Sequence, residues 1–313
     1  MSNFTSQPTL RLLQWTHSGC SAGKEADVKT GFIGLGTLGK AMAQRLIEQD
    51  VELVVWNRTL EKADGLSADV ASSPAGVLAR ADLVFLNLRD SAAVEDVLTG
   101  DNGLLSADCT GKIIVDTTTN HFEPVVGFAE MVAARGGQYL EAPVAGSVVP
   151  ASKGALTIFV SGDESAFEQA RPTLEHLGQK LFFLGAPGLA TRMKLVNNMV
   201  LGTFMATLAE AVVLGEAAGL GKAQVIEMLA AGGGNSGVLN AKRQKLLDED
   251  FSPHFSVSNI YKDLHYLLDL ARTVGHPAFT GSASRDLFAL AALQGHAEDD
   301  FSAIYAALKG SEK

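Results

Sequence analysis

The chain has 313 residues, of which 47% are hydrophobic, and this suffices for two domains with substantial cores. Its 25 basic and 35 acidic residues give a net charge of −10, which disfavours binding to nucleic acid or to an anionic membrane, because both need a basic surface. The two cysteines, Cys20 and Cys109, lack metal-ligand spacing. We therefore expect neither a disulfide framework nor a metal site, and we predict a cytoplasmic protein. No window approaches about 18 uninterrupted apolar residues, so no membrane span is predicted.

Residues 1–28 differ in composition from the rest of the chain. They are rich in Ser and Thr and show little apolar periodicity, and the segment 9–15 is too short for the apolar region of a signal peptide. We expect residues 1–28 to form a disordered extension or to result from an upstream start codon, with an organellar leader as the alternative.

Residues 29–189 carry short apolar runs of strand-like composition that alternate with helix-period segments. This alternation predicts a Rossmann-type α/β domain with a mostly parallel sheet and helices on both faces. The expected strands are Thr30–Leu35, Glu52–Trp56, Leu83–Asn87, Lys112–Asp116, Gln138–Ala142, Leu156–Ser161 and Lys180–Leu184. The expected helices include Leu38–Gln49 and Phe122–Arg135.

Residues 190–313 show no further strand signal. Ala190–Gly219 is a long run without proline and predicts one long helix, which is unusual in a globular domain unless it serves as a spine. Further helical segments follow to Leu308, and Gly232–Ser236 is the clearest loop. We predict an all-α C-terminal domain joined to the first domain by the long helix.

A glycine pattern stands between the first predicted strand and the helix that follows it. In Gly34-Leu35-Gly36-Thr37-Leu38-Gly39, the three glycines allow a tight turn, close approach to a pyrophosphate and close packing of helix on strand. The pyrophosphate would lie on the helix N-terminus, where free N–H groups favour anions. A glycine pattern alone is a weak signal, but this context favours dinucleotide binding over a simple turn.

The end of the second predicted strand indicates which dinucleotide is bound. NAD-specific sites usually place Asp or Glu there, to bind the ribose 2′-hydroxyl. This chain has Asn57, Arg58 and Thr59 instead, and the next acid is Glu61. An Arg pairs with a 2′-phosphate that an acid would repel, so the sequence favours NADP(H) over NAD(H). The alternative for Arg58 is a solvated loop charge.

Two more strand ends are expected to complete the cofactor site, because ligands bind outside the carboxyl ends of parallel strands. Leu88 follows the third predicted strand, Leu83–Asn87, and Thr119 lies just after the fourth, Lys112–Asp116. We predict that both lie near the nicotinamide half. Ordinary turn and cap chemistry would favour similar residues.

The long helix carries a polar cluster near its start. Lys194, Asn197 and Asn198 share one helix face within an otherwise apolar run. A lysine is costly to bury there without a purpose, and hydride transfer to a carbonyl needs a proton donor beside the developing alkoxide. We predict Lys194 as the acid–base residue, with Asn198 positioning the lysine or the substrate. A snorkelling lysine is the alternative.

Two other segments are candidates for anion binding. Glu141–Ser147, EAPVAGS, follows a strand end, and its backbone N–H groups suit a carboxylate. Lys262 lies on a later helical stretch, from which it would reach a cofactor phosphate or a substrate carboxylate. On spacing alone, a solvated charge pair with Asp263 is equally consistent.

Four segments in this order resemble the β-hydroxyacid dehydrogenase family, from about Val28 to Gly310. They are GFIGLGTLGKAMAQRL, EAPVAGSVVPASKGALTIFVSGD, MKLVNNMVLG and KDL. The resemblance implies that Lys194 is the catalytic acid/base assisted by Asn198, that the substrate carboxylate meets the Gly146 loop, and that Lys262 closes over the cofactor. It also implies a homodimer or homotetramer formed through the helical domain.

One position departs from the family pattern. The family's loop usually reads Pro-Val-Ser-Gly, with the serine hydroxyl on the substrate carboxylate, whereas this chain has Ala145. A lost donor costs on the order of 1 kcal/mol of binding. Ser147 is the nearest replacement, so the substrate site is expected to include Ala145, Gly146, Ser147, Lys194 and Asn198.

Three functions are consistent with these motifs. The leading prediction is an NADPH-dependent reductase of a small aldehyde or keto acid of the glyoxylate, succinic semialdehyde or tartronate semialdehyde class. The alternative enzyme is an imine reductase, a class that shares the two-domain plan but usually lacks a lysine at position 194. The third is a non-catalytic NADP-binding module, which the presence of Lys194 and Asn198 disfavours.

Overall fold

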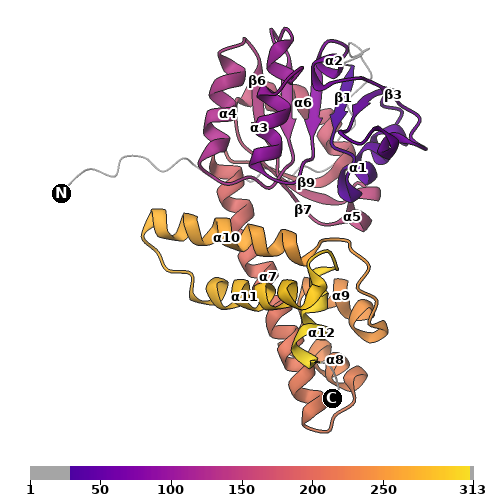
Figure 1. The fold of residues 1–313 in the computed structure, drawn as a ribbon, viewed down its shortest axis with the longest axis vertical. Helices are drawn as coiled ribbons and strands as arrows, with labels where there is room; N and C mark the ends of the chain where they lie inside the picture. The colour runs from indigo at the N-terminus through magenta and orange to yellow at the C-terminus, as the bar shows by residue number, and fades with distance from the viewer. Residues whose placement is uncertain (1–28, 311–313) are drawn as a thin grey trace, which may run out of the picture. The chain divides into compact units, whose positions relative to one another are not determined.

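The computed structural model describes residues 29–310, and the chain divides into two compact units, Met1–Thr191 and Arg192–Lys313. The extension expected over residues 1–28 lies outside the described residues. The two units are drawn in Figure 1, with the N-terminal unit in indigo and magenta and the C-terminal unit in orange and yellow.

The N-terminal unit is built on a six-stranded sheet in which every strand pair is parallel. The strand order is β3-β2-β1-β4-β5-β6, so the order reverses between β1 and β4. Dinucleotides bind at such a switch point, outside the carboxyl ends of the strands. The strands are β1 (Thr30–Ile33), β2 (Leu53–Trp56), β3 (Asp69–Val70), β4 (Leu83–Leu86), β5 (Ile113–Asp116) and β6 (Gln138–Glu141).

Helices cover both faces of this sheet, because successive strand residues point to opposite sides. Phe32 packs in one apolar cluster, with α1 (Thr37–Ile47) and α6 (Glu164–Leu177). Ile33 packs in the other, with α2 (Pro74–Leu78), α3 (Ser91–Thr99) and α4 (Pro124–Ala133). The predicted fold class, a Rossmann-type domain followed by a helical one, is confirmed.

The N-terminal unit also contains a second, three-stranded sheet, whereas a single, mostly parallel sheet was expected. It contains β7 (Val144–Ala145), β8 (Leu156–Val160) and β9 (Gly178–Phe183), with α5 (Val148–Ser152) between the first two. β8 and β9 are parallel, but β7 runs antiparallel to β8. The sequence did not predict β3 or β7, because two residues are too few to show an alternating pattern.

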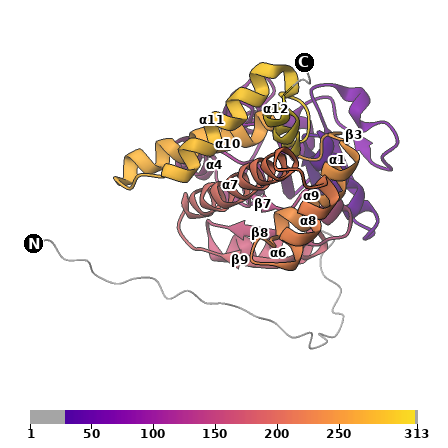
Figure 2. The same cartoon turned by 90° about the horizontal axis from the view of Figure 1, so that it is seen from below.

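The C-terminal unit is helical throughout the part that the structure describes. Its spine is α7 (Leu189–Ala217), close to the predicted helix 190–219. Helices α10 (Val257–Val274) and α11 (Phe279–Ala291) lie side by side in both views (Figures 1 and 2). Gly202 lets α7 approach α10 closely, since a Cβ there would lie 3.2 Å from Leu264 Cδ1. The other helices are α8 (Lys222–Ala231), α9 (Gly237–Asp248) and α12 (Ile304–Lys309). Short single turns lie at Leu60–Ala63, Leu104–Ser106, Ala292–His296 and Phe301–Ala303.

Among the described helices, α7 alone is long and apolar enough to cross a membrane by length and composition. No span was predicted from the sequence, because α7 has no uninterrupted apolar run of that length. It passes here because the mean hydropathy of its most apolar window is high, at 1.5. The core helix of a soluble protein passes the same test. α7 also carries buried polar side chains that bond to α10, as described below.

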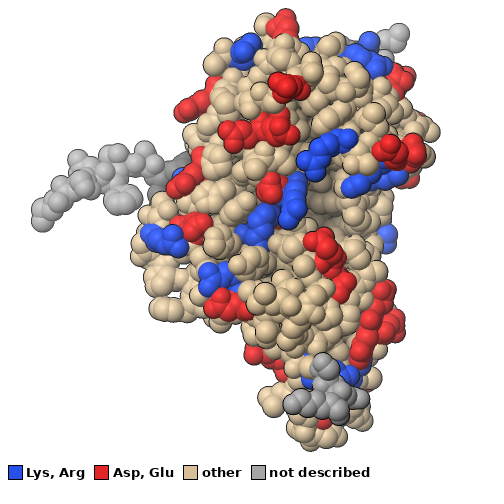
Figure 3. Space-filling model, in the orientation of Figure 1, with Lys and Arg blue, Asp and Glu red and all other residues tan. Residues whose placement is uncertain are grey.

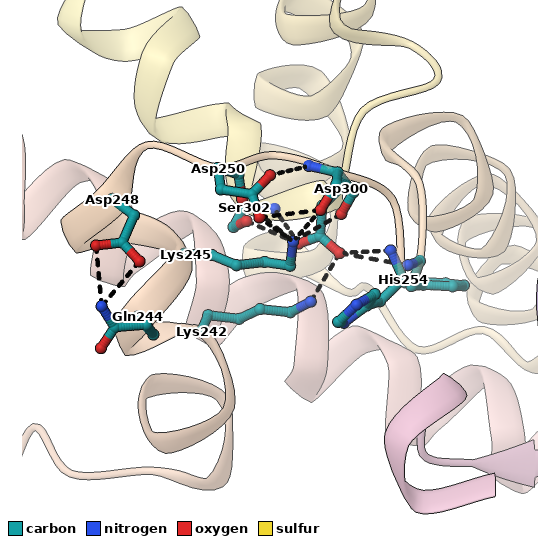
Figure 4. Close-up of polar contacts among 10 residues, drawn as sticks. Lys242, Gln244, Lys245, Asp248, Asp250, His254, Asp300 and Ser302 are labelled. Carbon is teal, nitrogen blue, oxygen red and sulfur yellow. Dashed lines mark hydrogen bonds and ion pairs between the residues drawn. The ribbon is translucent and has the colours of Figure 1, made fainter. Parts of the chain in front are cut away.

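A buried ion pair joins Asp300, which precedes the last short helices, to Lys242 on α9 (Figure 4). Lys242 Nζ lies 2.7 Å from Asp300 Oδ2, and both side chains are buried. The same carboxylate accepts hydrogen bonds from the backbone N–H groups of His254 and Phe255, at 3.1 and 3.3 Å, and from the Ser302 hydroxyl at 2.7 Å. Asp300 therefore holds the loop that leads into α10.

Candidate active site

The glycine loop between β1 and α1 has the geometry that a pyrophosphate requires. Gly34 has a φ of +97°, and a Cβ there would collide with the carbonyl oxygen of Asn87; a Cβ on Gly39 would collide with the oxygen of Gly34. At Gly36, by contrast, a Cβ would meet no atom within 4 Å. Gly34 and Gly39 thus close the turn, whereas Gly36 leaves open space for a ligand.

The first turn of α1 offers backbone donors to such a ligand. Its N-cap, Gly36, supplies no side-chain hydrogen bond, and its first turn contains no acidic residue. By comparison, α3 and α6 are capped by Asp90 and Asp163. The uncapped N–H groups and the helix dipole fit the diphosphate of a dinucleotide.

The end of β2 lies directly against this loop. Asn57 Oδ1 accepts a hydrogen bond of 2.8 Å from the Leu35 N–H, and Asn57 Nδ2 donates to the Thr59 carbonyl oxygen at 2.8 Å. The half-buried Asn57 amide therefore links the end of β2 to the glycine loop. Arg58 and Thr59 are exposed, and among the described residues no acidic side chain is paired with Arg58.

The ends of β4 and β5 meet on the other side of the switch point. The Leu88 N–H donates to Thr118 Oγ1 at 3.0 Å, so the segment after β4 is bonded to the turn that contains Thr119. Leu88 and Thr119 are both half-buried. The predicted cofactor residues of the N-terminal unit are thus gathered along the carboxyl ends of its strands, namely Gly34–Gly39, Asn57, Arg58, Thr59, Leu88 and Thr119.

The predicted substrate loop begins in β7 of the smaller sheet. Ala145 pairs with Thr157 and is half-buried, whereas Gly146 is exposed with a φ of +125°. Ser147 precedes α5 and makes no cap hydrogen bond to it. The loop therefore presents backbone and a hydroxyl to its surroundings.

In the C-terminal unit, Lys194 lies in a buried chain of polar groups. Its Nζ donates to Asn198 Oδ1 at 2.9 Å, and the same oxygen accepts from Asn197 Nδ2 at 3.1 Å. Lys194 is only 6% exposed, and burial lowers the pKa of its amine to about 8. A lysine with a pKa so close to neutrality can both give and take a proton.

Asp263 completes this chain, and sequence reasoning missed it. Asn198 Nδ2 donates to Asp263 Oδ2 at 2.6 Å, and Lys262 Nζ lies 3.0 Å from Asp263 Oδ1. Asp263 is 1% exposed. The expected alternative of a solvated pair is wrong for Asp263, because its side chain points to the buried face of α10.

A signal for Asp263 was present in the sequence. The buried residues of α10 recur at helical spacing as Val257, Ile260, Leu264, Leu267 and Leu270, and Asp263 falls on that same apolar face. A carboxylate at a core position needs a buried partner, which here is Asn198.

No metal cluster is found between residues 29 and 310, where no three His, Cys, Asp or Glu side chains are grouped to hold an ion. On the drawn face of the N-terminal unit, several basic side chains lie close together, with acidic side chains around them (Figure 3).

Two protein families match the chain in succession. Residues 29–185 match the NAD binding domain of 6-phosphogluconate dehydrogenase, and residues 188–308 match the family described as NAD-binding of NADP-dependent 3-hydroxyisobutyrate dehydrogenase. Together they span almost all of the described residues.

Curated relatives align over most of the chain. The chloroplastic glyoxylate/succinic semialdehyde reductase 2 of Arabidopsis thaliana is 35% identical over 288 residues, which cover 91% of this chain and 80% of the relative. The cytokine-like nuclear factor N-PAC of Xenopus tropicalis is also 35% identical, over 90% of this chain but 53% of the relative. The chain thus spans about half the length of N-PAC.

Solved structures share the two-unit fold. The structure described as Psf3 in complex with NADP+ and 2-OPP has a TM-score of 0.83 and 28% identity, covering 89% of this chain and 99% of that one. Mycobacterium tuberculosis 3-hydroxyisobutyrate dehydrogenase with L-serine has a TM-score of 0.79 and 28% identity, covering 90% and 99%. Streptomyces aurantiacus imine reductase, also 28% identical with the same coverage, has a TM-score of 0.60.

Both halves of the chain match in order, and a reductase is aligned over most of its own length. The chain therefore belongs to the β-hydroxyacid dehydrogenase family of NAD(P)-dependent oxidoreductases.

Proposed function

We propose that the protein is an NADPH-dependent reductase that converts a small aldehyde or keto acid, of the glyoxylate, succinic semialdehyde or tartronate semialdehyde class, into its hydroxy acid. The observation that carries the proposal is Lys194, buried on α7 and hydrogen-bonded to Asn198, with a pKa of about 8. A buried amine of that pKa is suited to acid–base work near neutral pH.

The chemistry divides between cofactor and lysine. A bound reduced nicotinamide supplies the hydride that adds to the carbonyl carbon. Lys194, protonated, gives a proton to the carbonyl oxygen as negative charge develops on it, and its positive charge stabilises that oxygen before the transfer. Asn198 holds the lysine through its side-chain oxygen. In the oxidative direction, the neutral amine of Lys194 takes the hydroxyl proton.

NADP(H) is the proposed cofactor because of the residues that follow β2. Arg58 is exposed there, and the nearest acid along the chain is Glu61. The Asn57 carboxamide, which is already bonded to Leu35, adds no negative charge to repel a 2′-phosphate. The Psf3 structure was obtained with NADP+, which supports the same choice.

A carboxylated substrate is proposed from the Gly146 loop and Lys262. The loop offers backbone N–H groups and the Ser147 hydroxyl, while Ala145 lacks the hydroxyl donor that the family usually has there. Lys262, already paired with Asp263, is proposed to close over the cofactor. The name of the Arabidopsis relative supports glyoxylate and succinic semialdehyde as first substrates.

The test is NADPH oxidation at 340 nm with glyoxylate, succinic semialdehyde, methylmalonate semialdehyde, tartronate semialdehyde and a cyclic imine, repeated with NADH. We expect turnover of at least one carboxylated aldehyde, faster with NADPH. Lys194→Met should abolish turnover and leave NADPH affinity nearly unchanged. Substantial activity in that variant would overturn the role of the lysine.

An imine reductase is the second candidate enzyme. It is favoured by the match to the Streptomyces aurantiacus enzyme and by Ala145, and disfavoured by Lys194. Activity on the cyclic imine with silence on every acid would favour it. A non-catalytic NADP-binding module is the third candidate, and the N-PAC relative is named as a nuclear factor rather than as an enzyme. Cofactor binding without turnover of any carbonyl acid would favour it.

Self-association through the helical unit, as a homodimer or homotetramer, is part of the proposal. α7 exposes a stripe of apolar side chains at helical spacing, namely Met193, Val196, Val200 and Phe204, each between 39% and 46% exposed. A second copy would cover such a stripe. Sedimentation velocity would test this self-association.

We also propose that the protein is cytoplasmic.

A further inference from the structure

Asp116 ends β5 with a buried carboxylate that only accepts hydrogen bonds. It is 1% exposed. Its Oδ1 accepts from the Thr118 N–H at 2.9 Å, and its Oδ2 accepts from Asn120 Nδ2 at 2.7 Å and from the Tyr139 hydroxyl at 2.5 Å. Burial raises the pKa of this carboxyl, and the hydrogen bonds oppose that effect. A buried carboxylate is costly unless it is hydrogen-bonded, and a fully bonded one holds its partners in a defined geometry.

The carboxylate sets the conformation of the turn formed by residues 117–120. Two of its three donors, Thr118 and Asn120, belong to that turn, and the third, Tyr139, comes from the neighbouring strand β6. Asp116 thus holds the turn through its bonds to Thr118 and Asn120, and the Tyr139 hydroxyl on β6 holds the Asp116 carboxylate.

The same turn is bonded to the end of β4. Thr117 Oγ1 donates to the Leu86 carbonyl oxygen at 2.6 Å and accepts from Asn87 Nδ2 at 2.9 Å, and the Leu88 N–H donates to Thr118 Oγ1 at 3.0 Å. These bonds therefore hold the ends of β4 and β5 and the turn together.

This unit adjoins the glycine loop and belongs to the second half of the sheet. A Cβ on Gly34 would collide with the Asn87 oxygen, so the two segments are in contact. In a doubly wound sheet, each half binds one mononucleotide of the dinucleotide. In the proposed function, the half built on β1, β2 and β3 takes the adenosine side through Arg58, and the half with β4 and β5 would then face the nicotinamide.

We propose that Asp116 is a positioning residue that fixes the turn 117–120 in the conformation that receives the nicotinamide half of the cofactor. The inference rests on the proposed function for its cofactor. An Asn at position 116 cannot replace the carboxylate, although it has the same shape. Its NH2 group would face either the Thr118 N–H or the donors from Asn120 and Tyr139, and at least one buried donor would lose its acceptor.

The experiment compares the whole cofactor with its adenosine half. Calorimetry would measure Kd for NADPH and for 2′,5′-ADP, which lacks the nicotinamide, in the full-length wild type and in Asp116→Asn, Tyr139→Phe and Val132→Ala. The last variant shortens a buried side chain of α4 in the same apolar cluster as Tyr139, and it is the control for a general loss of packing. If the wild type prefers NADH, the pair becomes NADH and ADP-ribose.

We expect Asp116→Asn to weaken NADPH about tenfold and to leave 2′,5′-ADP within about twofold of the wild type. Tyr139→Phe should change the same ratio in the same direction but less, and Val132→Ala should leave it unchanged. Parallel loss of both ligands, no loss of either, or a wild type that binds no dinucleotide would overturn the inference. Wild-type binding without turnover would instead count against the proposed reaction alone.

Discussion

Asn198 and Asp263 are joined by a hydrogen bond of 2.6 Å between α7 and α10, from Nδ2 to Oδ2. Because a carboxylate only accepts, this bond fixes the orientation of the amide, and the Asn198 oxygen must then face Lys194. Burial has the largest effect on the pKa of Lys194 and lowers it. The charge of Asp263 raises that pKa, and the charge of Lys262 lowers it.

These opposite charges predict opposite shifts in the pH dependence of reduction. The proton donor is the charged amine, so kcat/KM should be constant below about pH 8 and fall above it. Asp263→Asn removes an attraction and lowers the Lys194 pKa, so the fall should begin at lower pH. Lys262→Met removes a repulsion and should move it to higher pH. Shifts in the same direction in the two variants would contradict this account.

The cofactor preference should depend on Arg58. In Arg58→Leu we expect Kd for NADPH to rise about tenfold, because a charge-assisted hydrogen bond to the 2′-phosphate is lost, while Kd for NADH changes little. Arg135→Leu is the control, since it removes the same charge from an exposed site just beyond the end of α4. An equal effect of both variants would mean that only net charge matters.

Much of this fold could be predicted, because strong local patterns specify it. The strands from β1 to β6 that are four residues long, and the spine helix α7, lie within two residues of their expected bounds. β3 and β7 could not be found, since each has two residues and depends on its partner strand for its conformation. The separation of β7, β8 and β9 into a second sheet likewise depends on which strands pair in the folded protein, and local sequence patterns do not show that.

The candidate site was predictable only where its parts are close in sequence. Lys194 and Asn198 are one helical turn apart, so their bond follows from helix geometry. Asp263 is 65 residues from Asn198, and no local pattern states that α10 packs its acidic side chain against α7. Asn57 was expected to contact the cofactor, yet its amide is bonded to Leu35 and Thr59, which the strand-end pattern does not reveal.

Substrate affinity should respond to a hydroxyl restored at position 145. Ala145→Ser should lower KM for glyoxylate about fivefold, because a neutral hydrogen bond to the carboxylate is worth about 1 kcal/mol. If Ser147 already provides that donor, Ser147→Ala should raise KM by a similar factor, and the double variant should resemble the wild type. An unchanged KM in both Ala145→Ser and Ser147→Ala would place the carboxylate away from this loop.

Stability of the C-terminal unit should depend on the buried pair Lys242–Asp300 (Figure 4). Burial by itself raises the pKa of Asp300, but Lys242 and the hydrogen bonds outweigh it, so the pKa is lowered. A lowered folded pKa means that this stabilisation is present above the unfolded value of 3.8 and is lost as pH falls through the folded pKa. Thermal melts at neutral pH and at successively lower pH should follow that loss.

Asp300→Asn at neutral pH leaves the Lys242 charge buried without its partner. We expect a loss of about 3–5 kcal/mol in the free energy of unfolding, and a thermal midpoint lower by about 10 °C. The double variant Lys242→Met/Asp300→Asn removes both charges and keeps a side-chain oxygen for the N–H groups of His254 and Phe255, so it should recover more than half of that loss. Because the pair touches none of the proposed catalytic residues, kcat at a permissive temperature should stay near the wild-type value. A double variant less stable than Asp300→Asn would show that the unpaired charge is not the cause.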